Sequence, residues 1–110
     1  MLIFKIVPRP EWEAAGDIYA GSANDRADGF LHFSMAPQLP TTLRLYYAGQ
    51  RDLLLISVDS DTVAADLKFE PAPSRGEDFP HLFAPLLRST AKWVRPIGFD
   101  GAEFVLPPLD

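Results

Sequence analysis

The chain has 110 residues, 47% of them hydrophobic and 23% charged, and its formal net charge is -5. This composition is typical of one folded domain over residues 1–110, and the acidic balance disfavours binding to long nucleic acids. The absence of cysteine excludes disulfides, thiolate metal sites and cysteine nucleophiles. No apolar run approaches the ~20 residues of a membrane span, and no basic leader precedes an apolar segment, so we expect a cytoplasmic protein without a membrane partner.

The first part of the chain predicts one strand, one short helix and a polar loop. Residues 2–7 are typical of a strand that turns apolar side chains toward the core and Lys5 toward solvent. A helix over residues 10–15 follows, with proline and glutamate at its N-terminal end and Gly16 after its last residue. Residues 17–29 are rich in aspartate and glycine, which predicts a loop.

Residues 28–34, Asp-Gly-Phe-Leu-His-Phe-Ser, contain one of the two histidines and predict a turn followed by a short strand. Side chains alternate between the faces of a strand, so Leu31 and Phe33 point one way while His32 and Ser34 point the other. This places an imidazole and a hydroxyl side by side on one face. The pattern therefore predicts a functional site on this strand.

The remaining chain adds a helix and several strands. Thr41 or Thr42 can cap a helix that runs to about Ala48, and the near-continuous apolar run 53–58 predicts a central strand buried on both faces. Further elements are a short strand at 67–70, an exposed loop at 71–78, a stiff segment at 79–83, and strands near 93–94 and 103–106. Together they predict an α+β fold with a mostly antiparallel or mixed sheet and two or three short helices.

His32, Ser34 and His81 are the candidates for a site with chemistry. A histidine on a strand can orient ligand hydroxyls, act as a general base or polarise a carbonyl, whereas the alternative is a polar strand face satisfied by backbone groups. Pro80 stiffens the segment that presents His81, and the alternative there is a histidine packed beside aromatic rings. A shared site requires His81 to lie within about 10 Å of His32, a distance that one ligand can bridge.

Several other side chains are candidate ligand contacts. Asp25 and Asp28 precede the histidine strand, with turn formation as their alternative role. Tyr19, Tyr46 and Tyr47 are candidates for stacking on a planar ligand ring, with core packing as the alternative. The chain has no GxSxG elbow, no HxH or HExxH spacing and no glycine-rich phosphate loop, so we predict neither a serine triad nor a metal site.

Two blocks, DGFLHFS at 28–34 and FPHLF at 79–83, are the most specific part of a longer series of motif residues. The series runs in order from about residue 4 to residue 87 and includes Trp12 and Tyr47-Ala48-Gly49. In this combination the chain resembles the bacterial and plant family called domain of unknown function 952. The resemblance implies a small α+β fold related to ADP-ribosyltransferases and RNA 2'-phosphotransferases.

The resemblance also implies roles for individual residues. His32 would bind the nicotinamide-side ribose of NAD, and Ser34 would be its hydroxyl neighbour. Tyr46 or Tyr47 would stack on the nicotinamide. NAD is therefore the expected cofactor, and a small molecule is the expected partner.

The catalytic glutamate of many such transferases has no clear counterpart here. Glu103, near the last strand, is the best-placed candidate, and Glu70 is the second. One hypothesis is therefore an enzyme that binds NAD or an ADP-ribose-like nucleotide at His32, Ser34 and His81, with ADP-ribosyl or phosphoryl transfer. The alternative is a non-catalytic module that binds a small metabolite or a peptide.

Overall fold

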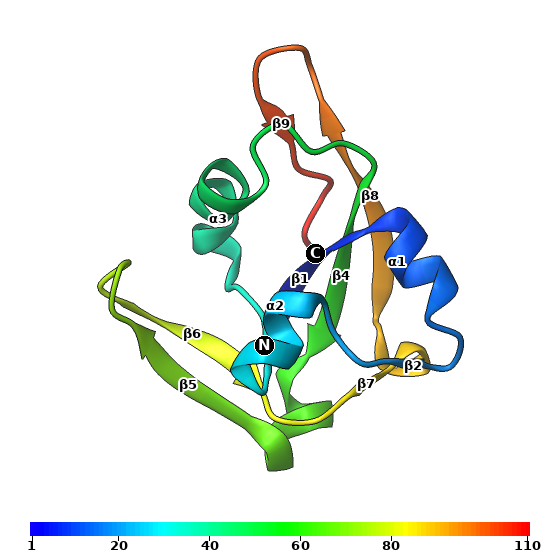
Figure 1. The fold of residues 1–110 in the computed structure, drawn as a ribbon, viewed down its shortest axis with the longest axis vertical. Helices are drawn as coiled ribbons and strands as arrows, with labels where there is room; N and C mark the ends of the chain where they lie inside the picture. Colours follow the sequence, from blue (N-terminus) through cyan, green and yellow to red (C-terminus); the bar gives the residue numbers. More distant parts are fainter.

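The computed structural model describes all of residues 1–110, which form nine strands and several short helices (Figure 1). The strands are β1 (Leu2–Pro8), β2 (Ile18–Tyr19), β3 (Leu31–His32), β4 (Leu53–Asp59), β5 (Leu67–Ala72), β6 (Glu77–Leu82), β7 (Leu86–Leu87), β8 (Trp93–Phe99) and β9 (Phe104–Val105). The α-helices are α1 (Arg9–Ala14), α2 (Ala23–Asp28) and α3 (Leu39–Tyr46), and three 3-10 helices span Ala36–Gln38, Ser60–Asp66 and Arg88–Thr90. No helix is both long enough and apolar enough to cross a membrane.

All strand pairs are antiparallel, and they form three sheets. The largest has the order β1-β4-β8-β9, a second pairs β2 with β7, and the third has the order β3-β6-β5. Figure 1 shows the β5–β6 hairpin at one side of the central sheet, below α3, and α1 with β2 and β7 at the other side. The predicted α+β class with mostly antiparallel pairing is confirmed.

The core lies on both faces of β4, the central strand predicted from the apolar run 53–58. Leu54 and Ile56 belong to one buried apolar cluster, and Leu53 and Leu55 belong to a second. Successive side chains of a strand point to opposite faces, so a strand buried on both faces needs an unbroken apolar run. The position of β4 between β1 and β8 provides that environment.

The prediction of a loop at residues 17–29 is wrong, because this segment contains both β2 and α2. Ser22 is the N-cap of α2: its hydroxyl accepts a hydrogen bond from the Asp25 amide at 3.0 Å, and the Asp25 carboxylate accepts one from the Ser22 amide at 2.9 Å. This capping box stabilises a short helix in a segment whose composition favours turns. Gly29 ends the helix at φ 86°, a left-handed conformation that glycine adopts without a steric cost.

Two further boundaries differ from the sequence-based ones. The helix expected from Thr41 or Thr42 begins at Leu39 instead, and no side chain caps it. The expected loop at 71–78 is shorter, because β5 extends to Ala72 and β6 begins at Glu77. The turn of this longer hairpin carries Arg75, whose Nη1 lies 3.1 Å from Thr42 Oγ1 of α3.

Candidate functional site

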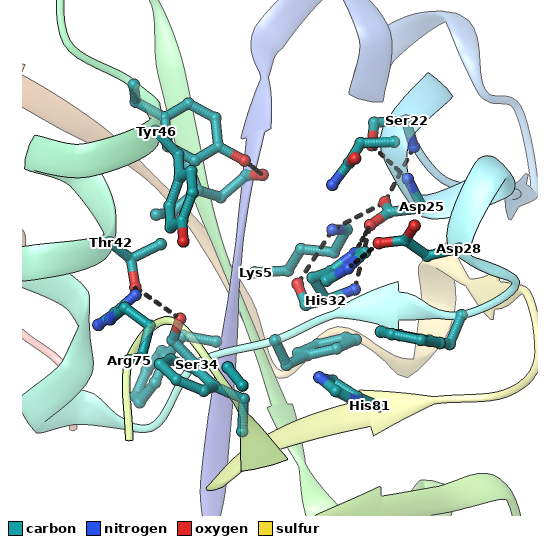
Figure 2. Close-up of a pocket in the computed structure, with 18 of the residues that line it drawn as sticks. Lys5, Ser22, Asp25, Asp28, His32, Ser34, Thr42, Tyr46, Arg75 and His81 are labelled. Carbon is teal, nitrogen blue, oxygen red and sulfur yellow. Dashed lines mark hydrogen bonds and ion pairs between the residues drawn. The ribbon is translucent and has the colours of Figure 1, made fainter. Parts of the chain in front are cut away.

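A pocket of about 580 Å³ opens between β1, α2, β3, α3 and the β5–β6 hairpin (Figure 2). Seven of the ten side chains proposed from the sequence line it: Asp25, Asp28, His32, Ser34, Tyr46, Tyr47 and His81. They come from segments far apart in the chain, and the strand pairing described next brings them together.

The two histidines are direct cross-strand neighbours. β3 pairs with β6 so that His32 lies opposite His81, and their ring centroids are 5.7 Å apart. This is well inside the separation of about 10 Å that one ligand can bridge. Phe30 stacks on the His81 ring with centroids 4.0 Å apart, while Leu31 and Phe33 are buried in the core on the opposite face. The strand faces are therefore those that the alternation predicts.

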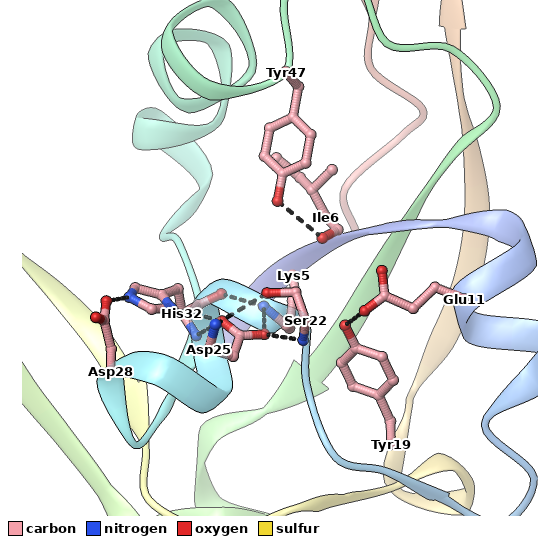
Figure 3. A network of polar contacts seen from close by, with 9 residues as sticks. All are labelled: Lys5, Ile6, Glu11, Tyr19, Ser22, Asp25, Asp28, His32 and Tyr47. Carbon is pink, nitrogen blue, oxygen red and sulfur yellow. Dashed lines mark hydrogen bonds and ion pairs between the residues drawn. The ribbon is translucent and has the colours of Figure 1, made fainter.

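His32 lies between two carboxylates of α2 (Figure 3). Its Nδ1 is 2.6 Å from Asp25 Oδ1, and its Nε2 is 2.9 Å from Asp28 Oδ2. An ionised carboxylate only accepts hydrogen bonds, so both ring nitrogens must carry hydrogen for both bonds to form. The two contacts fix the orientation of the His32 ring and leave neither of its nitrogens free toward the pocket.

Asp25 is the centre of this network, although its side chain is only 2% exposed. Besides His32, it accepts hydrogen bonds from the Ser22 amide and pairs with Lys5 Nζ at 2.9 Å. Burial alone would raise the pKa of Asp25, but the hydrogen bond from His32 and the charge of Lys5 outweigh it, so the pKa lies well below its usual value. Asp25 is therefore an ionised structural group.

Lys5 corrects a sequence-based expectation. The alternation of β1 predicts that it points to solvent, but its side chain is 3% exposed and lies in the wall of the pocket. Its Nζ bonds Asp25 and donates to the backbone oxygen of His32 at 3.0 Å. A charged side chain in the middle of an apolar strand is a signal of a buried partner, but the sequence does not say which carboxylate that partner is.

His81 has a different environment from His32. Its Nδ1 is 2.9 Å from Glu70 Oε1 on the neighbouring strand β5. A carboxylate beside Nδ1 holds the hydrogen there, which leaves Nε2, without a partner in the protein, as the nitrogen that can accept a proton. His81 is thus the candidate general base of the pair, and Glu70 is its positioning residue.

The opposite end of the pocket holds hydroxyls and one arginine. Ser34 Oγ is 3.3 Å from Thr42 Oγ1 on α3, and Arg75 Nη1 donates to the same Thr42 oxygen at 3.1 Å (Figure 2). The guanidinium of Arg75 also lies 4.5 Å from the centroid of the Phe79 ring. Thr42 and Arg75 were missed by the sequence analysis, because a single arginine in a turn carries no local signal of a site.

The three tyrosines are in different situations. Tyr19 is 2% exposed in the core and donates to Glu11 at 2.8 Å, so the expectation that it contacts a ligand is corrected. Tyr47 donates to the Ile6 carbonyl at 3.3 Å, and burial raises its pKa to about 12. Tyr46 is 55% exposed at the pocket edge, which makes it the tyrosine that is free to stack on a ligand.

Glu103 lies outside this pocket, which we call the histidine pocket because His32 and His81 line it. It lines a second pocket of about 490 Å³ together with Arg44, Arg51 and Phe104, and it is not among the residues that line the histidine pocket. The structure therefore separates this candidate catalytic acid from His32 and His81. No cluster of three or more histidine, aspartate or glutamate side chains is arranged to hold a metal ion.

The fold and the site define a small antiparallel α+β domain whose main pocket is built around a cross-strand histidine pair. The chain belongs to the family described as "Protein of unknown function (DUF952)", whose model matches residues 6–94. The membership expected from the two motif blocks is thereby confirmed.

Among solved structures, the chain is similar to protein CC0527 from Caulobacter crescentus. The crystal structure of that protein superposes with a TM-score of 0.86 at 39% sequence identity, covering 92% of this chain and 90% of the other. Its solution NMR structure gives a TM-score of 0.83 at 38% identity, covering 94% and 90%. No curated protein matches the chain.

Proposed function

We propose that the histidine pocket binds a small nucleotide of the NAD or ADP-ribose type. The observation that carries the proposal is the cross-strand pair of His32 and His81, each held by carboxylates, in the wall of a pocket of about 580 Å³. Pockets for small ligands commonly measure about 300–1,000 Å³ and combine apolar walls with a few fixed polar groups.

The polar groups around His32 suit a ribose. Asp28 is half exposed, and its carboxylate can accept hydrogen bonds from vicinal ribose hydroxyls in addition to its contact with His32, which holds it in place. Phe30 and the exposed Tyr46 offer aromatic faces for a planar ring. The family resemblance to ADP-ribosyltransferases, in which a strand histidine contacts the nicotinamide-side ribose, supports the same assignment for His32.

The transfer activity that this resemblance implies requires a base in the pocket. His81 fits that role, because Glu70 holds its Nδ1 hydrogen and leaves Nε2 to accept a proton. In such a reaction an acceptor hydroxyl gives its proton to Nε2 while its oxygen bonds to the ribose carbon. Nicotinamide leaves with the electron pair of the broken glycosidic bond.

A non-catalytic binding module is the second candidate, and the position of Glu103 favours it. That carboxylate lines a different pocket, Asp25 and Asp28 are both hydrogen-bonded to His32, and Glu70 is hydrogen-bonded to His81. No carboxylate without a protein partner therefore lies beside the histidine pair to stabilise positive charge on a ribose during transfer.

Calorimetric titration with NAD, ADP-ribose and a 2'-phosphorylated ribonucleotide tests the proposal. We expect saturable binding of at least one of them, its loss in His32→Ala, and its retention in the exposed control variant Lys92→Gln. Mass spectrometry of the mixture with NAD separates the two candidates: released nicotinamide supports transfer, and unchanged NAD supports binding alone. The absence of heat for all three ligands at millimolar concentration would overturn the nucleotide assignment.

A further inference from the structure

The two ends of the histidine pocket differ in charge. At the histidine end, Lys5 and His32 contact the carboxylates of Asp25 and Asp28 at N···O distances of 2.6–2.9 Å. At the other end, the one cationic side chain is Arg75, and the carboxylate nearest to it, Glu77 Oε2, is 4.0 Å away. The positive charge of Arg75 is therefore poorly compensated by the protein.

The hydrogen bonds of Arg75 are also incomplete. Its side chain is only 6% exposed, and Nη2 is buried without a hydrogen-bond partner. Such a group is costly to leave unpaired, so an arginine in this state usually has a partner that completes it. The cation–π contact of the guanidinium with Phe79 helps to hold Arg75 in place without using any of its N–H donors.

The two hydroxyls beside Arg75 extend the set of donors. Thr42 Oγ1 accepts the hydrogen bond from Arg75 Nη1, so the Thr42 hydroxyl hydrogen is free to point to Ser34 or into the pocket. When it points to Ser34 Oγ, the Ser34 hydrogen has no protein acceptor in turn. Donors thus accumulate at this end, as oxyanion sites require.

We propose that Arg75, Thr42 and Ser34 form an oxyanion subsite that binds the phosphate of the ligand. The inference rests on the proposed function, because it gives the bound nucleotide a direction, with its ribose at His32 and its phosphate at Arg75. A guanidinium with neighbouring hydroxyls binds a carboxylate by the same chemistry, so the experiment compares both kinds of anion.

The test compares wild-type protein with Arg75→Gln, and uses Arg44→Gln as the matched control, because Arg44 is an exposed arginine of α3 outside this pocket. Calorimetry is performed with ADP-ribose and with uncharged adenosine. We expect Arg75→Gln to weaken ADP-ribose binding by about tenfold or more, the effect of losing a charged hydrogen bond, and to leave adenosine binding unchanged. Unchanged ADP-ribose binding in Arg75→Gln, or an equal loss for both ligands, would overturn the subsite.

A second measurement keeps this result distinct from the nucleotide proposal. Arginine side-chain ¹⁵N NMR follows Arg75 directly while inorganic pyrophosphate or glutarate is added to the wild-type protein. A saturable shift of the Arg75 signals that Thr42→Val weakens supports the subsite even if no nucleotide binds, and the tighter anion identifies the source as phosphate or carboxylate. If neither anion shifts Arg75, the subsite is refuted, including in the case where Arg75→Gln fails to fold.

Discussion

Removing the charge of Asp25 should reveal how strongly the buried network stabilises the fold. In Asp25→Asn, the amide keeps the shape of the side chain, but Lys5 becomes a buried cation without its counterion. Breaking a buried ion pair from one side costs about 3–5 kcal/mol, out of a total stability of roughly 5–15 kcal/mol for a domain. With an m-value of about 2 kcal/mol per molar urea, the urea concentration at the unfolding midpoint should fall by roughly 2 M.

Two further variants make this prediction specific. Asp28→Asn is the matched control, because Asp28 is 47% exposed and should lose less than about 1 kcal/mol. Adding Lys5→Met to Asp25→Asn removes the uncompensated cation and should restore part of the loss. Equal midpoints for Asp25→Asn and Asp28→Asn, or a double variant less stable than Asp25→Asn alone, would refute the reasoning.

Three further predictions follow from burial and charge. Phe33→Ala should lower the free energy of unfolding in urea by about 3–5 kcal/mol, because it leaves a cavity in the core. The His32 side chain is 34% exposed, so His32→Ala should cost only about 1 kcal/mol, and the reverse order would contradict the strand faces. The pKa of Asp25 is lower in the folded than in the unfolded state, so its stabilisation is present above the unfolded value of 3.8 and is lost as the pH falls below it. Asp25→Asn should therefore show a flatter acid limb in a plot of stability against pH. The pKa of Tyr47 is raised from 10.0 to about 12, so its contribution is lost as the pH rises through that window, and Tyr47→Phe should lose less stability there than wild type.

Local patterns predicted the parts of the fold that depend on local physics. The apolar run 53–58 predicts a strand buried on both faces, because only a central strand can hide side chains in both directions. The alternation of residues 30–34 predicts which face of β3 meets the core. The capping box of Ser22 and Asp25 was available to the same reasoning, but the glycines and aspartates around it favoured a loop.

Partners that come from distant segments could not be predicted in this way. The register of β3 on β6 places His32 opposite His81, and register depends on the whole hydrophobic pattern rather than on the spacing of two residues. The burial of Lys5 depends on Asp25 in α2, and the role of Arg75 depends on how far the β5–β6 hairpin extends toward α3. Glu103 was placed by its nearness to the last strand, but β9 pairs with β8 at the far edge of the central sheet.

The central claim is that the histidine pocket binds a nucleotide, and both histidines of the chain line that pocket. Imidazole ¹H–¹³C NMR therefore observes the site directly, with only two residues contributing signals. During titration with ADP-ribose, we predict saturable shifts of both His32 and His81 with a single dissociation constant. Unchanged histidine signals at millimolar ADP-ribose, while other parts of the protein respond, would contradict the account.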